Sequence, residues 1–378
     1  KALVATAMAA GAAFLVVVMR ERRRMRRQLM GNFVDVDGKK IYCEVQGEGN
    51  FTVVLDAGLG MSSLSWHWIK DVLVSRTRVV CFDRPGLGYS PPDKGPSWLR
   101  RVDSIVDLTY QLLGKLKLQE NLILVGHSSS GMHVRLYAHL YREQVKGIVL
   151  IDAAHEKQLQ KLQGNSIYNS YPSREMTEHK MKRLKFLSNT GLLRIMYLIS
   201  GPEFSRLCWQ FPLFVYVLKF FDMLGRSVAV SARQNERILG PHFPEHLRSR
   251  FQAEQSDAAS MLAMISEHGS QKDSMEYMQT LDIMKPGQLG NMPLMIVSRD
   301  PQRGAGGRLY PNAKGDPVRE KLHEEFQLEQ AALSSNSSRK VVEGAGHGSL
   351  LFVKEDAEET AKAILQLVDA ARNGSQLR

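Results

Sequence analysis

The feature that most constrains the fold is a series of short apolar runs that alternate with helical patterns. After a hairpin pattern at 32–46, such runs occupy 52–56, 78–82, 121–125 and 145–151. Continuous Val, Ile and Leu runs of this length are typical of strands that are buried on both faces of a parallel sheet. Because crossover connections of this kind are right-handed, the pattern predicts an α/β protein with a doubly wound, mostly parallel sheet.

The alternation stops at about residue 156 and resumes with an apolar run at 293–297. The segment between them is helical in pattern and rich in Met, Phe, Tyr and Leu. A helix near 318–333, a strand at 340–342 and a closing helix near 353–371 follow, so the sheet is completed only after this segment. We therefore expect one core, formed by 31–155 and 289–378, that carries an inserted helical lid at 156–288.

The first 27 residues combine an apolar run with a basic cluster. Residues 2–19 carry no charge, and residues 20–27 hold six arginines and one glutamate. The run just reaches the length that spans a hydrocarbon core of about 30 Å. Its charges follow the run, unlike those of a signal peptide, and the run is apolar all round, unlike a mitochondrial presequence. We expect a single-pass membrane anchor helix at 2–19 with a polybasic flank.

The basic flank also predicts the orientation of the chain, because positive residues favour the cytoplasmic side of a membrane. The catalytic domain should then face the cytoplasm, and the glycosylation sequons that begin at Asn50, Asn336 and Asn373 should stay bare. Three cysteines, Cys43, Cys81 and Cys208, show no disulfide or metal spacing, which fits a reducing compartment.

Charge argues against a nucleic-acid partner. The formal net charge is +11, and residues 1–27 alone hold seven basic residues against one acidic residue. Much of the positive charge therefore lies beside an apolar segment. It does not form a basic patch with interleaved aromatic residues, which is what nucleic-acid binding favours.

The sharpest local motif is Val125-Gly-His-Ser-Ser-Ser-Gly131, which ends a predicted strand and opens a helix at 130–141. A serine in such a strand–turn–helix context is typical of a nucleophile elbow, whose flanking positions must be small. Gly126 and Ser130 meet that requirement. The alternative for the motif by itself is a serine-rich helix N-cap.

Further motifs follow the ends of other predicted strands, where doubly wound sheets build their sites. Asp56-Ala-Gly-Leu-Gly60 follows the first central strand, and Gly344-Ala-Gly-His347 follows the last one. The backbone N–H groups of Leu59 and Ser129 could together hold an oxyanion, although the glycine loop by itself could be a plain turn. His347 is a candidate base for Ser128.

Three motifs in this order resemble the α/β-hydrolase superfamily, in its serine hydrolase branch: Asp83-x-Pro-Gly-x-Gly-x-Ser90, Gly126-His-Ser-x-Ser-Gly131 and Gly344-x-Gly-His347. The resemblance implies that Ser128 is the nucleophile, that His347 is the base and that Leu59 and Ser129 supply the oxyanion hole. It implies no cofactor. Epoxide hydrolases and haloalkane dehalogenases of this fold need a carboxylate where Ser128 stands.

The order of the triad leaves two candidates for the acid. Asp152 ends the strand at 145–151, a position that some branches of the superfamily use. Asp300 follows the strand at 293–297, the commoner acid strand, but Val-Ser-Arg-Asp does not reproduce the usual Gly-x-x-Asp spacing. We favour Asp152 and keep Asp300 as the alternative.

The most apolar part of the lid, 191–224, is either the core of the lid or an apolar wall over an acyl pocket. With the anchor, it predicts a membrane-anchored serine hydrolase that cleaves esters of apolar or lipid-like acids. The alternative is a catalytically inactive, membrane-tethered binding module that keeps the pocket.

His133 and His139 lack a carboxylate motif, so we expect no metal site there. The sequence does not predict the residues that bind substrate or the oligomeric state.

Overall fold

The computed structural model describes residues 32–93, 100–161, 234–281, 283–312 and 314–377, with a few single positions between 175 and 186. The predicted anchor and its flank at 1–27 lie outside these residues, as do Cys208 and the apolar stretch 191–224. No helix in the described part of the chain is long and apolar enough to cross a membrane.

The chain divides into two compact units. One comprises 1–33 with 180–262, and the other comprises 34–179 with 263–378. The second unit contains the sheet and every residue of the candidate site. It also contains α13 (Gln271–Thr280) and the end of α12 (Ala258–Gly269), both of which fall within the range predicted for the lid.

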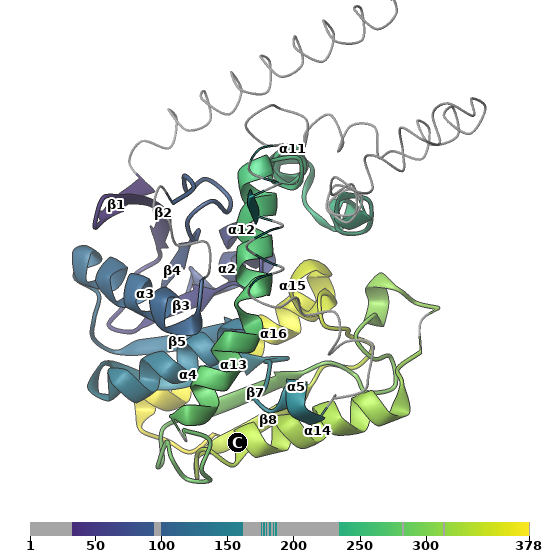
Figure 1. Cartoon of the computed structure of the whole chain (residues 1–378). Coiled ribbons are helices and arrows are strands. Elements are labelled where there is room, and N and C mark those ends of the chain that lie inside the picture. Colours follow the sequence, from purple (N-terminus) through teal and green to yellow (C-terminus); the bar gives the residue numbers. More distant parts are fainter. Residues whose placement is uncertain are drawn as a thin grey trace, which may run out of the picture. The chain divides into compact units, whose positions relative to one another are not determined.

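The sheet of the described residues has the order β1-β2-β4-β3-β5-β6-β7-β8 (Figure 1). The β2–β4 pair is antiparallel, and the neighbours from β4 to β8 are parallel. This confirms the mostly parallel sheet that the sequence predicted. The strands are β1 (Phe33–Val36), β2 (Lys39–Gln46), β3 (Thr52–Asp56), β4 (Arg78–Phe82), β5 (Leu122–His127), β6 (Val145–Ile151), β7 (Leu294–Ser298) and β8 (Ser337–Val341).

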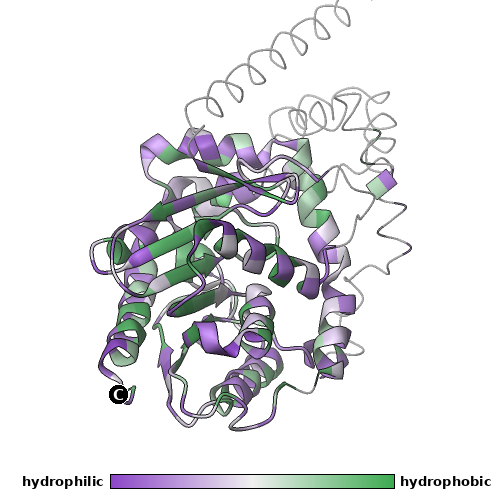
Figure 2. Ribbon diagram, turned by 90° about the vertical axis from the view of Figure 1, so that its left-hand side faces the viewer, coloured by the Kyte–Doolittle hydropathy of each residue, from purple (hydrophilic) through white to green (hydrophobic). Residues whose placement is uncertain are grey.

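Helices cover both faces of the sheet because its central strands are apolar for most of their length and almost fully buried (Figure 2). On one face, Val54, Leu124 and Ile148 join a core with the packed pair α3 (Val102–Leu116) and α4 (Ser130–Leu140). On the other face, α16 (Lys354–Asn373) packs on α2 (His67–Leu73) and on β6. The remaining helices beside the sheet are α5 (Gln158–Lys161), α14 (Pro317–Ala331) and α15 (Ser349–Phe352).

The element boundaries differ from the predicted ones where the sequence pattern is weak. The predicted helix at 64–74 is a 3-10 turn, η2 (Ser63–Trp66), followed by α2, and the hydroxyl of Ser62 caps its start. β8 begins three residues before the predicted 340–342. It is the last strand of the sheet and is only partly buried, so its polar residues carry little of the apolar pattern on which the prediction relied.

Candidate active site

Ser128 occupies a tight turn between β5 and α4. Its φ is 58°, in the left-handed region that non-glycine residues adopt only where the surrounding structure imposes it. A Cβ on Gly126 would lie 2.5 Å from the carbonyl oxygen of Ser130, and one on Gly131 would lie 2.4 Å from the Cβ of Ala153. The turn therefore needs glycine at both positions, and it is the strand–turn–helix geometry of a nucleophile elbow.

His347 reaches the serine from the loop that follows β8. Its Nε2 lies 3.0 Å from the Oγ of Ser128, and its Nδ1 lies 2.5 Å from Oδ2 of Asp152. The side chain of His347 is 35% exposed, whereas that of Asp152 is fully buried. The backbone N–H of His347 donates to the carbonyl oxygen of Ala305 over 2.9 Å, which fixes the loop. Two turns that lie 219 residues apart in sequence thus meet at one edge of the sheet.

The two candidate acids take different positions. Asp152 follows β6, the strand next to β5, and faces the His347 ring. Asp300 instead accepts hydrogen bonds from the backbone N–H of Gln302 (2.9 Å) and of Gly344 (2.8 Å). Asp300 therefore holds the loop that carries His347, and Asp152 completes a serine–histidine–aspartate line.

Three side chains that were not predicted from the sequence form a cluster with Asp152: two contact its carboxylate, and the third contacts one of these two. Nη1 of Arg299 lies 2.7 Å from Oδ2, the oxygen that also faces His347, and Nε2 of His323 lies 2.8 Å from Oδ1. Glu320 accepts two hydrogen bonds from the Arg299 guanidinium, over 3.0 and 3.2 Å. We call Asp152, Arg299, Glu320 and His323 the acid cluster. No local pattern in the sequence marks it, because its members come from β6, the loop after β7 and α14.

The charge state of Asp152 follows from these partners. Burial alone would raise the pKa of its carboxyl group, but His323 and Arg299 hold the pKa well below its ordinary value. The carboxylate therefore remains ionised and can balance a positive charge on the His347 ring.

His127, which precedes the serine, has a supporting position. Its buried Nε2 lies 3.0 Å from the carbonyl oxygen of His347. Burial, with a further contribution from the nearby His347 ring, lowers the pKa of His127 to about 3. The ring is therefore neutral at physiological pH, and its Nε2–H donates to that carbonyl. His127 thus fixes the backbone of His347 without adding charge to the site.

The two backbone N–H groups predicted for the oxyanion hole lie beside Ser128. Leu59 and Ser129 both line the cavity that Ser128 and His347 reach. Neither backbone N–H donates a hydrogen bond to any residue that the structure describes. Since backbone donors are nearly always paired, two unpaired donors next to the serine are suited to an oxygen that a substrate would bring.

The cavity in front of the serine has a volume of about 490 Å³, the size of an ordinary small-molecule pocket. Part of its wall is apolar and part is charged. Leu59, Ala153, Met275, Leu322 and Phe326 contribute the apolar surface, while Lys314, Asp316, Arg319 and Glu320 are among the charged lining residues.

His133 and His139 are the two histidines of α4, the helix that follows the elbow. Nδ1 of the buried His133 lies 2.7 Å from Oδ2 of Asp56, and His139 is exposed. Within the described residues, no group of three or more His, Cys, Asp or Glu side chains is placed to hold a metal ion.

Comparisons with known proteins bear on the fold. The family model described as "alpha/beta hydrolase fold" matches residues 52–174. The uncharacterized protein YbdG of Bacillus subtilis (strain 168) is 26% identical over 179 residues, which cover 47% of this chain and 51% of that protein. The chain spans about half or less of the length of the curated relatives that it matches.

Solved structures resemble almost the whole chain. A thermophilic esterase from Thermogutta terrifontis has a TM-score of 0.54 at 16% identity, and the match covers 90% of this chain and 97% of the esterase. The epoxide hydrolase CorEH has a TM-score of 0.54 at 15% identity, and the match covers 89% of this chain and 98% of that protein. At these identities the likeness shows the fold.

Proposed function

We propose that this protein, which has the α/β-hydrolase fold, is a serine hydrolase that cleaves carboxylic esters through an acyl-enzyme on Ser128. The observation that carries the proposal is the hydrogen-bonded line from Ser128 Oγ through the His347 ring to Asp152, with distances of 3.0 and 2.5 Å, at the wall of a cavity. A serine at the elbow, where epoxide hydrolases need a carboxylate, favours acyl transfer over epoxide opening.

In the proposed reaction, Nε2 of His347 takes the hydroxyl proton of Ser128 as Oγ attacks the carbonyl carbon of the ester. The carbonyl oxygen becomes an oxyanion that accepts hydrogen bonds from the N–H groups of Leu59 and Ser129. The intermediate collapses, the C–O bond to the alcohol breaks, and His347 returns its proton to the leaving alcohol.

Water then completes the cycle. His347 removes a proton from a water molecule that attacks the acyl carbon, and the carboxylic acid leaves as Ser128 regains its proton. The ionised Asp152 balances the imidazolium charge in both halves of the reaction.

We also propose that the acyl group is apolar. The apolar lining residues, among them Met275, Leu322 and Phe326, provide a wall suited to a hydrocarbon chain. A panel of p-nitrophenyl esters of increasing acyl length tests this. kcat/KM should rise from acetate to medium chains, and a steady fall with length would reject an apolar acyl site.

A fluorophosphonate probe tests the nucleophile directly. The probe phosphonylates an activated serine, so wild type should be labelled, and labelling and ester hydrolysis should both vanish in Ser128→Ala. If folded wild-type protein is neither labelled nor active, the chain is instead a binding module that keeps the pocket.

The membrane anchor remains a proposal that rests on the sequence: an uncharged run at 2–19 and six arginines at 20–27. In cells, the full chain should stay in the pellet after alkaline carbonate extraction, and replacement of Val16 and Val17 by Arg should release it. Peptide N-glycosidase should cause no mobility shift if the catalytic domain faces the cytoplasm. Extraction of wild type would reject the anchor, and a mobility shift would reject the orientation.

A further inference from the structure

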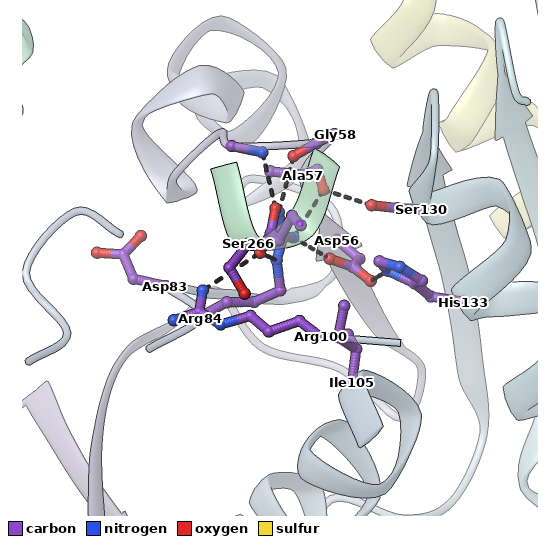
Figure 3. A network of polar contacts seen from close by, with 12 residues as sticks. Asp56, Ala57, Gly58, Asp83, Arg84, Arg100, Ile105, Ser130, His133 and Ser266 are labelled. Atoms are coloured by element: carbon purple, nitrogen blue, oxygen red, sulfur yellow. Dashed lines mark hydrogen bonds and ion pairs between the residues drawn. The ribbon is translucent and has the colours of Figure 1, made fainter. Parts of the chain in front are cut away.

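A buried guanidinium lies behind the loop that supplies one of the proposed oxyanion donors. Arg84, which follows β4, is 2% exposed and forms an ion pair with Asp56 over 2.7 Å (Figure 3). It forms a second ion pair with Glu267, also over 2.7 Å. Glu267 belongs to α12 and is 3% exposed. We call Arg84, Asp56 and Glu267 the loop cluster, because Asp56 begins the loop 56–60 and the other two side chains bind its backbone.

Arg84 also binds the loop backbone itself. Its Nη1 donates to the carbonyl oxygen of Ala57 and its Nη2 to that of Gly58, each over 2.7 Å. The carbonyl of Gly58 and the N–H of Leu59 belong to one peptide group. In a trans peptide these two groups point in opposite directions, so the hydrogen bond from Arg84 to the carbonyl turns the Leu59 N–H away from the cluster.

The next peptide group is fixed from the same cluster. The N–H of Gly60 donates to Oε2 of Glu267 over 2.7 Å, and Gly60 has a φ of 68°. A Cβ at this position would lie 2.5 Å from Cγ of Met264 on α12. Both peptide groups that flank the Leu59 side chain are thus held by charged partners, and the Leu59 N–H between them stays unpaired in the described part of the chain.

We propose that Arg84 is a positioning residue for the oxyanion hole, which orients and polarises the Gly58–Leu59 peptide so that the Leu59 N–H faces the reacting carbonyl oxygen. The inference rests on the proposed serine hydrolase function. A hydrogen bond from a cation to the carbonyl draws electron density from the peptide group and strengthens its N–H as a donor. Glu267 anchors the far side of the loop and compensates the charge of Arg84.

The decisive variant is Arg84→Lys, which keeps the charge but cannot reach both carboxylates and both carbonyls from one ammonium group. In the detergent-solubilised full chain, kcat should fall about 10- to 100-fold. This reduction is no larger than the one expected when an oxyanion donor is removed completely. KM should change less than about threefold, because the ground-state ester makes little use of that donor. The rate of fluorophosphonate labelling and the affinity for an alkyl boronic acid, which forms a tetrahedral adduct on the serine, should fall in parallel with kcat.

A second buried pair provides the matched control. Nη1 of Arg135 lies 2.8 Å from Glu156, and both side chains are as buried as those of the loop cluster. Arg135→Lys should lower the unfolding temperature by a similar amount but leave kcat of the folded enzyme within about threefold of wild type. If Arg84→Lys is not recovered folded, Glu267→Gln gives the same test, since it keeps an acceptor for Gly60 and removes one of the two carboxylate charges that hold Arg84.

Labelling and boronic acid binding of wild type distinguish a failure of the Arg84 inference from a failure of the proposed function on which it rests. If wild type is labelled by fluorophosphonate and binds the boronic acid, while Arg84→Lys is destabilised but has unchanged kcat and boronic acid affinity, Arg84 is a structural residue and the inference is wrong. If wild type shows neither labelling nor boronic acid binding, the proposed function fails and the inference fails with it.

Discussion

Two buried charge clusters lie on the two sides of β5, and they differ in what they contact. The loop cluster, beside the loop that follows β3, is shielded from solvent. Its Arg84 and Glu267 are 2% and 3% exposed and bind backbone groups of the loop 56–60. The acid cluster beyond β6 lines the cavity, and its Arg299 binds the side chain of Asp152. A charged group that binds backbone can fix a donor, whereas one that binds a carboxylate can also change how that carboxylate acts.

The acid cluster is arranged for the second effect. Arg299 and His347 share one oxygen of Asp152, so the guanidinium reduces the negative charge that the imidazolium experiences. Glu320 binds the other nitrogens of Arg299 and offsets its charge. His323 accepts from Nη1 of Arg299 through Nδ1, over 3.2 Å, which leaves its Nε2–H to face Asp152. The cluster therefore balances the charge of the proposed triad acid.

The largest expected effect separates Asp152 from Asp300. Asp152→Asn should reduce kcat by about 10⁴-fold, because a neutral amide neither balances the imidazolium nor fixes its tautomer. Asp300→Asn leaves one acceptor oxygen for the two N–H groups of Gln302 and Gly344, and it should reduce kcat by about tenfold or less, with a lower unfolding temperature. Steady-state kinetics and thermal unfolding of both variants measure this. An equal loss of kcat in both would contradict the assignment of Asp152 as the acid.

How far the sequence predicted this site depends on how local each feature is. Ser128 and His347 were predicted because each lies in a short motif whose glycines the turn itself requires. The sequence favoured Asp152 only slightly over Asp300, since both residues follow apolar strands. Asp152 and Asp300 take different positions because β6 pairs with β5, and because the carboxylate of Asp300 accepts a hydrogen bond from the N–H of Gly344. Both are properties of the assembled sheet.

The two clusters were missed for a related reason. Arg299 meets Asp152 across 147 positions, and Arg84 meets Glu267 across 183. No spacing rule connects such pairs. Glu267 and its helix were predicted to belong to the lid, because the sequence at 156–288 has no strand-like pattern from which the start of the core unit could be inferred.

A smaller effect should distinguish the acid cluster from the loop cluster by pH dependence. Arg299→Gln removes the guanidinium that, together with His323, holds the pKa of Asp152 well below its ordinary value, so the acid limb of kcat/KM should move to higher pH. Glu320→Gln leaves Arg299 less compensated, so the limb should move to lower pH. Each shift should be up to about one pH unit.

Arg84→Lys is the comparison variant for this experiment, because its cluster binds backbone and its acid limb should stay in place. The neutral His127 and the cavity residues Lys314, Asp316 and Arg319 are present in all three variants. Shifts of the same sign in Arg299→Gln and Glu320→Gln would show that the acid cluster acts only by supporting the structure.

The smallest effect concerns stability and tests whether the buried charge of Glu267 stabilises the loop cluster. Burial alone would raise the pKa of Glu267, but Arg84, with a contribution from Arg100, holds it below its ordinary value of 4.5. A carboxylate with a lowered pKa in the folded state stabilises the protein above the unfolded pKa and loses this contribution as the pH falls through the folded pKa. At pH 7, Glu267→Gln should therefore unfold about 2–6 °C below wild type. The difference should narrow as the pH falls below 4.5. The control Glu48→Gln, at an exposed position, should unfold at the wild-type temperature at pH 7. If the difference in unfolding temperature between wild type and Glu267→Gln stays constant down to acid pH, the ionised carboxylate adds no stability and Glu267 contributes only through packing.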